Sequence, residues 1–342
     1  MDLRSNYMGL QLPSPLVASA SPLTADLASL LTLQEAGAGA VVLPSLFAEQ
    51  IDAETRRHIA LSMAGADSSP EARSYLPAPE LDETETHRYL YLVRRASSAL
   101  TIPVIASLNG ATEANRTHYA RQLEDAGANE LELNIYFVAS DLALDGHAIE
   151  DRYPHIVQAV RQRVRIPIAV KLSPYFSAPG NFAIQLADAG ADAVVLFDQF
   201  YQPDIDTVRL KLRNNLELSR ASEMRVALLW TCILHGRINA SLAASTGVHT
   251  PDHVVQCLLA GADVVMTTSS LLQHGAGHMR TLINGLSVWL DNRHMALDAM
   301  RGTLAQRNLA NPEDYQRANY IKILQGYGTA PAYRDGSFLR PC

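Results

Sequence analysis

The chain has 342 residues, of which 48% are hydrophobic and 18% are charged, so it can bury a large apolar core. Its formal net charge of −7 argues against a nucleic-acid partner or an anionic membrane surface, because both favour a basic face. The chain lacks an apolar run of about 18 residues and a signal-peptide pattern, so we expect a cytoplasmic protein without a membrane span.

Eight short apolar runs are predicted to form strands, at residues 15–19, 40–44, 103–108, 130–135, 167–172, 193–198, 240–244 and 263–268. Four of them follow one pattern, in which the end of an amphipathic helix is followed by Ala-Gly-Ala and then by a β-branched apolar run. A glycine just past a helix can adopt the left-handed conformation that ends it, and a continuous apolar run indicates a strand buried on both faces. Helical segments separate most of the strands, notably 112–126, 153–164, 181–189 and 251–259.

This alternation predicts an α/β protein built as a closed (β/α)₈ TIM barrel, with residues 1–342 forming a single domain. An open, doubly wound sheet is the alternative. Such a sheet normally carries a glycine-rich turn after its first strand, and Ala18-Ser19-Ala20-Ser21 is not one.

Two connections are longer than simple loops, at residues 46–84 after the second strand and 199–225 after the sixth. Both leave the C-terminal rim, where barrel enzymes keep their chemistry, so we expect them to cover the site; plain insertions are the alternative. The tail, residues 293–342, is predicted to contain a helix at 314–325. We expect it to pack on the barrel or on a second subunit.

The three cysteines, Cys232, Cys257 and Cys342, have neither metal-ligand nor redox spacing, and we expect no metal site. Cys257 is expected to be a core residue on a helix. A reducing compartment is the simplest setting for such cysteines.

Lys171 is unusual because it lies within the apolar strand at 167–172. An ammonium group at a strand end needs an anionic or polar partner, since burying it unpaired is costly. A lysine that extends to solvent is the alternative.

The turns after the last two strands are rich in small and hydroxyl-bearing residues, namely Ser245-Thr246-Gly247-Val248 and Thr267-Thr268-Ser269-Ser270. Backbone N–H groups and hydroxyls in such turns bind anions, and this fold commonly holds phosphate after strands seven and eight. Hydroxyl-rich turns are also frequent as helix caps, and we expect His249 to cap the helix that follows. The pair of turns predicts a phosphorylated ligand.

In order and strand placement, several segments resemble the dihydroorotate and dihydropyrimidine dehydrogenase superfamily of FMN barrels, and above all its soluble, dihydroorotate dehydrogenase-like branch. The matching segments are Leu16-Val17-Ala18-Ser19, Ala106-Ser107-Leu108-Asn109-Gly110, Glu132-Leu133-Asn134, Val170-Lys171-Leu172-Ser173-Pro174, Ser245-Thr246-Gly247-Val248 and Met266-Thr267-Thr268-Ser269. The resemblance extends from about residue 3 to residue 325.

The resemblance implies FMN as the cofactor. Lys171 would lie at flavin N1/O2, where a cation stabilises the negative charge of reduced flavin. The other residues that the resemblance places beside FMN are Ala18, Ser19, Ser107, Asn134, Ser245, Thr246, Gly247, Val248, Thr268 and Ser269. Thr246 stands where relatives usually have a second glycine, so its Cβ would crowd the phosphate.

The sequence departs from the family where the substrate is recognised. Phe137 occupies the position of the cysteine or serine base and cannot accept a proton. Ala139 replaces an asparagine that would bind orotate, and Pro44 stands in place of a lysine. Losing several buried hydrogen-bonding partners, each worth roughly 1–3 kcal/mol, should abolish recognition of orotate.

If the protein is an enzyme, Tyr136 and Asp198 are the candidate proton donors. Tyr136 adjoins the old base position, and Asp198 follows the sixth strand in an apolar setting. The favoured hypothesis is an FMN-dependent oxidoreductase that transfers hydride between flavin and a small organic substrate.

Two alternatives remain open. One is a catalytically degenerate barrel that binds flavin or a partner. The other is a phosphate-binding lyase or isomerase with Lys171 as Schiff-base nucleophile. The chain has neither an iron–sulfur cysteine cluster nor a Rossmann fingerprint, so electrons would pass through a partner protein or by direct access to the flavin. We also expect a homodimer.

Overall fold

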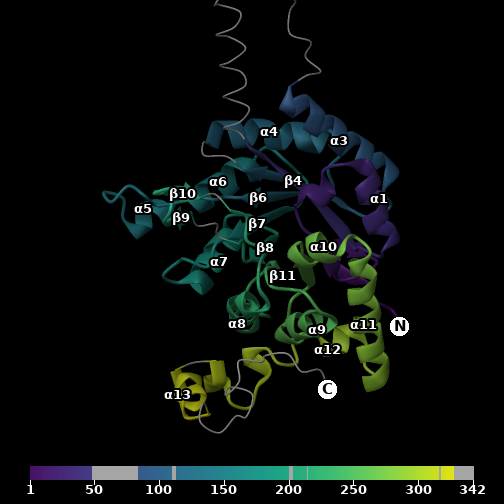
Figure 1. The fold of residues 1–342 in the computed structure, drawn as a ribbon, viewed down its shortest axis with the longest axis vertical. Coiled ribbons are helices and arrows are strands. Elements are labelled where there is room, and N and C mark those ends of the chain that lie inside the picture. Colours follow the sequence, from purple (N-terminus) through teal and green to yellow (C-terminus); the bar gives the residue numbers. More distant parts are fainter. Residues whose placement is uncertain (48–83, 110–112, 200–202, 214, 316, 327–342) are drawn as a thin grey trace, which may run out of the picture.

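The structure is a computed structural model that describes the whole chain except residues 48–83, 110–112, 200–202, 214, 316 and 327–342. Its centre is a closed barrel of eight parallel strands in the order β11-β12-β3-β4-β5-β6-β7-β8 (Figure 1). The strands are β3 (Leu16–Ala18), β4 (Ala40–Phe47), β5 (Val104–Asn109), β6 (Glu130–Asn134), β7 (Ile168–Leu172), β8 (Ala193–Leu196), β11 (Ser241–Ala244) and β12 (Val264–Thr267). Each one overlaps a predicted strand, so the predicted TIM barrel is confirmed.

Helices surround the barrel. The longer ones are α1 (Leu27–Glu35), α3 (Glu85–Ala99), α4 (Glu113–Asp125), α6 (Arg152–Arg161), α7 (Pro179–Asp188), α8 (Met224–Leu234), α9 (Pro251–Ala260) and α11 (His278–Arg293). The glycine of each Ala-Gly-Ala segment has a positive φ, between 99° and 112°, as the hand-off from helix to strand requires; these are Gly37, Gly127, Gly190 and Gly261. Cys257 is buried on α9, as predicted.

Alternate strand residues fill the inside of the barrel. This inner cluster is made of small and β-branched side chains, including Val17, Ala169, Val195 and Val264. Its floor is the hairpin of β1 (Ser5–Tyr7) and β2 (Leu10–Leu12), which places Tyr7, Met8 and Leu12 in the same cluster. The hairpin binds the N-terminal ends of the strands, because Met8 N donates to Ser241 Oγ at 3.1 Å. The barrel is therefore closed at its N-terminal end, and the opposite end is left for a ligand.

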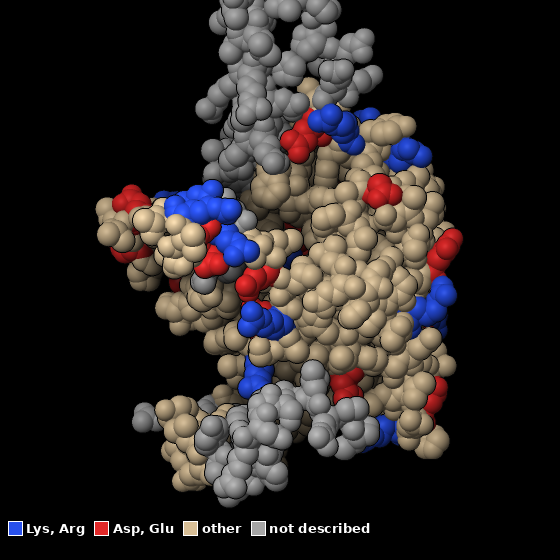
Figure 2. Space-filling view, in the orientation of Figure 1, with Lys and Arg blue, Asp and Glu red and all other residues tan. Residues whose placement is uncertain are grey.

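The connection after β8 carries a second hairpin, of β9 (Asp204–Asp206) and β10 (Lys211–Arg213), and then returns to the barrel mouth. Figure 2 shows basic side chains over this hairpin with acidic ones beside them. The longer predicted insertion, at 46–84, falls almost entirely outside the described residues.

The described chain also contains shorter α-helices. They are α5 (Gly146–Glu150) before α6, α10 (Ser269–His274) after β12, and α12 (Leu297–Met300) and α13 (Arg317–Gly326) in the tail, where a helix was predicted. Within the described residues, every helix is too short or too polar to cross a bilayer.

Candidate active site

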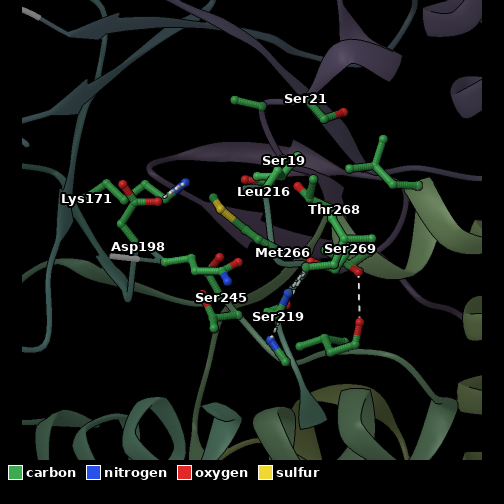
Figure 3. A pocket seen from close by; sticks show the side chains of 18 of the residues that line it. Ser19, Ser21, Lys171, Asp198, Leu216, Ser219, Ser245, Met266, Thr268 and Ser269 are labelled. Carbon is green, nitrogen blue, oxygen red and sulfur yellow. Dashed lines mark hydrogen bonds and ion pairs between the residues drawn. The ribbon is translucent and has the colours of Figure 1, made fainter. Parts of the chain in front are cut away.

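A pocket opens at the C-terminal end of the barrel, between the ends of β3, β7, β8, β11 and β12 (Figure 3). The turns after β11 and β12 form the polar part of its wall. The residues that line it are Ser19, Ala20, Ser21, Pro22, Lys171, Asp198, Gln199, Leu216, Leu218, Ser219, Ser245, Thr246, Gly247, Val248, Met266, Thr267, Thr268, Ser269 and Leu272. The strands that supply them lie far apart in the sequence, and closing the barrel brings their ends together.

Lys171 forms the cationic end of the pocket. Its side chain is only 8% exposed, and its Nζ lies 3.4 Å from Asp198 Oδ1 and 3.8 Å from Glu132 Oε1. Asn134 supports this arrangement by donating from Nδ2 to Asp198 Oδ2 at 3.0 Å. The predicted need for an anionic partner is thus met by two carboxylates, and the alternative of a lysine extended to solvent is wrong.

The turns after β11 and β12 meet at the other end of the pocket. Thr267 Oγ1 donates to Val248 O at 2.9 Å, which ties one turn to the other. Ser219, from the connection after β8, lies between them: its Oγ accepts from Gly247 N at 3.2 Å and donates to Ser269 Oγ at 2.8 Å. Three segments therefore converge on a set of hydroxyl and backbone N–H groups, which we call the cradle.

Thr246 and Gly247 both have left-handed backbone conformations, with φ of 74° and 75°. For a β-branched residue this conformation is strained, and Thr246 Oγ1 donates to Phe197 O at 2.8 Å, which stabilises it there. A Cβ at position 247 would lie 2.7 Å from Met224 N and 2.8 Å from Arg220 O, so only glycine fits.

His249 does not cap α9, contrary to the prediction. Thr250 is the cap, with its side chain accepting from His253 N. His249 Nε2 instead hydrogen bonds to Ser219 O at 2.7 Å. The imidazole reaches across the turn because the chain at Ser219 passes directly over it, which sequence spacing does not reveal.

The remaining predicted residues do not line this pocket. Ala18 packs in the outer core between the barrel and the helices. Ser107 is buried, and its hydroxyl lies 2.8 Å from Ser45 Oγ. Asn134 contacts the pocket through Asp198, and Tyr136 is partly buried outside the pocket wall.

Phe137 and Ala139 face a different pocket. It lies between the connections that follow β6 and β7, and its aromatic wall includes Tyr153, Tyr175 and Phe176. The Arg152 guanidinium stacks over the Phe137 ring, 4.9 Å from its centroid. Phe137, which the resemblance places at the position of the base, therefore lines a different pocket from Lys171 and the cradle.

Two functional candidates escaped the sequence analysis. Ser219 lies in a long insertion, where no periodicity gives a register. Glu132 is fully buried beside Lys171, and its pKa is raised overall: burial is the main cause, the Lys171 ammonium opposes it by lowering the pKa, and Asp198 adds to the rise. The sequence does contain a signal for Glu132. Acidic residues at positions 130 and 132 alternate with apolar ones in a predicted strand, so both carboxylates are expected on the same face of it.

Comparison with known proteins gives one consistent result. The catalytic subunit of the NAD(+)-dependent dihydroorotate dehydrogenase B of Methanocella arvoryzae is 28% identical over 310 residues, which cover 90% of this chain and 99% of the relative. The corresponding subunit of Thermoplasma acidophilum is 23% identical, over 85% of this chain and 94% of the relative. A putative fumarate-type dihydroorotate dehydrogenase A of Aeropyrum pernix is 29% identical over 56% of this chain and 63% of its own length.

None of the protein-family models compared with the chain matches it. The resemblance to dihydroorotate dehydrogenases nevertheless covers most of the chain in several relatives, and the closed parallel barrel agrees with it. The chain therefore resembles the dihydroorotate dehydrogenases over most of its length, which supports a dihydroorotate dehydrogenase-like protein of the dihydroorotate and dihydropyrimidine dehydrogenase superfamily.

Proposed function

We propose that this protein is an FMN-dependent oxidoreductase that transfers hydride between flavin and a small organic substrate other than dihydroorotate. One observation carries the proposal: a buried ammonium group and a hydroxyl-rich cradle lie at opposite ends of a single pocket. The names of the relatives, which are dehydrogenases acting on dihydroorotate, support the reaction class.

The cradle has the chemistry that a phosphate requires. Gly247 N and the Ser269 hydroxyl each hydrogen bond to the Ser219 hydroxyl, and a phosphate oxygen can replace these interactions. Glycine at 247 is obligatory there. The hydroxyls of Ser245 and Thr268 line the same wall. In this proposal Ser19, Ser245, Thr246, Gly247, Val248, Thr268 and Ser269 hold FMN, with Ser219 added.

At the other end, Lys171 faces the pyrimidine edge of the flavin. When bound, FMN supplies a two-electron acceptor whose reduced form is negatively charged on that edge. The chain contributes the cation that stabilises this charge, and the carboxylates of Asp198 and Glu132 favour the charged form of the amine. Asp198 also lines the pocket, so it is the candidate to hold or deliver a proton. Tyr136 is a weaker candidate because it lies outside the pocket wall.

The same geometry argues against dihydroorotate as the substrate. Phe137 has no proton-accepting group, and both Phe137 and Ala139 face the aromatic pocket. The proposed substrate therefore lacks the polar groups by which orotate is recognised and is a small conjugated or cyclic compound. We further propose that electrons pass through a partner protein, since the relatives are named as catalytic subunits. Homodimer formation stays a prediction.

The test begins with colour. Protein purified from its host, or refilled with FMN after removal of bound ligand, is expected to show the visible absorption of oxidised flavin. A screen is then expected to identify a conjugated enone that restores the absorption of flavin first reduced with dithionite, or the corresponding saturated compound that bleaches oxidised flavin. Protein that remains colourless after reconstitution would overturn the proposal in favour of a barrel that has lost its cofactor.

The degenerate barrel has one observation in its favour, since Ser219 already satisfies Gly247 N and Ser269. The lyase or isomerase is disfavoured, because a Schiff-base lysine must be neutral to attack and two carboxylates favour the ammonium form. Borohydride is accordingly expected to trap no sugar phosphate on Lys171.

A further inference from the structure

Two glutamates lie inside the barrel beneath the proposed flavin site. Glu130 and Glu132 both belong to β6 and point inward, since alternate residues of a strand share a face. Their side chains are 0% and 1% exposed. All four carboxylate oxygens lack a hydrogen-bond partner among the described residues. Buried carboxylates without partners are costly, so a compensating charge or a bound proton is required.

Lys171 supplies that compensation for Glu132. The two strands are neighbours, with Asn134 on β6 paired with Lys171 on β7, so the amine reaches back over the inner face of β6. Its Nζ lies 3.8 Å from Glu132 Oε1, and both side chains are buried. Asp198 is nearer to the amine, at 3.4 Å, but it is 18% exposed and also accepts a hydrogen bond from Asn134. Water and Asn134 therefore share the stabilisation of Asp198, whereas Glu132 depends on the amine.

Glu130 differs from its neighbour. Burial, then Asp192 and Glu132, raise the pKa of Glu130 to about 8, so it carries a proton at neutral pH. Among the described residues, the phenols of Tyr7, from the floor hairpin, and Tyr89, from α3, also face this cluster, and the carboxyl group of Asp263 lies near Tyr7. Burial is the main cause that raises the pKa of each phenol, so both phenols stay neutral.

We propose that Glu132 is a positioning residue, which keeps the Lys171 amine charged and fixed at the inner end of the pocket, while Glu130 plays no part in the site. In a buried setting an ion pair has little screening from water, so the charge of each partner depends strongly on the other. The statement that Lys171 faces a flavin rests on the proposed function. The coupling between Glu132 and Lys171 does not, because it requires no bound flavin.

The composition of the chain makes this coupling measurable. Among 28 basic residues, only three are lysines: Lys171, Lys211 and Lys322. Protein grown on lysine carrying ¹³C at Cε will therefore give three side-chain signals, whose shifts report the charge of each amine. The Lys171 signal is assigned by its absence from the Lys171→Met variant.

The experiment compares Glu132→Gln with Glu130→Gln, which changes the same residue type on the same face of the same strand. In the flavin-free full-length protein, Glu132→Gln is expected to lower the pH at which the Lys171 amine titrates by about 1 to 3 units. Glu130→Gln is expected to leave it unchanged, and Asp198→Asn to shift it less than Glu132→Gln. An unchanged midpoint in Glu132→Gln, or a larger shift in either of the other variants, would overturn the proposal.

A second variant covers a failure of Glu132→Gln to fold. Glu132→Asp keeps the charge but withdraws it by one methylene, and a smaller fall, of about half a unit, is expected. An unchanged midpoint there also contradicts the proposal. Adding FMN to the wild type separates the two ideas: if the Lys171 signal does not move, the proposed contact with flavin fails, while the coupling to Glu132 is judged by the titrations alone.

Discussion

The two sides of the barrel mouth differ in kind. On the side formed by β7, β8, β11 and β12, a buried amine, a carboxylate and several hydroxyls converge on one pocket. On the side formed by the connections after β6 and β7, the wall is largely aromatic, with Phe137, Tyr153, Tyr175 and Phe176. The rings of Tyr153 and Phe176 pack edge to face, with centroids 5.4 Å apart.

The two sides therefore offer different chemistry. The first has the polar groups that a phosphorylated cofactor needs, and the second is largely aromatic. A fold does not dictate a substrate, since function depends on the particular groups placed on it.

The largest effect is expected at Lys171. Replacing it by methionine removes the cation from the reduced flavin and leaves Asp198 and Glu132 unpaired beside it. If the loss resembles that of one oxyanion-hole donor, roughly 100- to 1,000-fold, the midpoint potential of bound FMN falls by about 60–90 mV. The measurement is a redox titration followed by flavin absorbance. Lys211→Met, on the exposed β10 strand, is the control, and an equal fall in both variants contradicts the assignment.

The next effect concerns the cradle backbone. Gly247→Ala introduces a Cβ at a positive φ and within 2.8 Å of two backbone atoms, so the segment at 220–224 must shift. We expect a loss of about 3 kcal/mol of unfolding free energy and loss of FMN binding. Gly9→Ala is a matched control, because Gly9 in the turn between β1 and β2 also has a positive φ, 84°, but its Cβ would meet open space. Urea unfolding should show a loss of only about 1–2 kcal/mol there. Equal losses would mean that the cradle is not closely packed.

Sequence reasoning recovered the barrel because its signals are local. Each Ala-Gly-Ala segment marks the end of a helix by a glycine with positive φ and the start of a buried strand by β-branched residues. The same logic found Lys171, since a charge within an apolar strand is conspicuous. It also found the turns at 245–248 and 267–269, because a parallel barrel brings consecutive strand ends to one rim.

The parts of the site that were missed depend on long-range contacts. Ser219 reaches the cradle from an insertion, and the position of His249 follows from that contact. Side-chain direction was the other difficulty. Tyr136 and Phe137 come shortly after β6, and Phe137 lies in the aromatic pocket. Side chains alternate between two faces only within a strand, so the direction of a side chain beyond the strand end could not be predicted.

A smaller effect is expected for Ser219→Ala. If the hydroxyl binds phosphate, its loss removes one hydrogen bond to a charged group and weakens FMN about tenfold. The dissociation constant can be measured by quenching of flavin fluorescence. Ser14→Ala is the control, because the buried Ser14 hydroxyl donates to Gly37 O, away from the pocket. Tighter binding by Ser219→Ala would show that the hydroxyl competes with phosphate and would favour the degenerate barrel.

The smallest effect is expected on the aromatic side. Phe137→Ser restores the residue type that some relatives would use as a base, but it leaves that residue in the aromatic pocket, apart from Lys171 and the cradle. The variant loses the stacking of Arg152, worth about 0.5–1 kcal/mol, and gains no partner for orotate. We therefore expect no oxidation of dihydroorotate, followed as orotate absorbance, and an unchanged midpoint potential of the bound FMN. Orotate formation by this variant would mean that the two pockets act as one site and that a single lost base, rather than the rebuilding of a whole wall, separates this chain from its relatives.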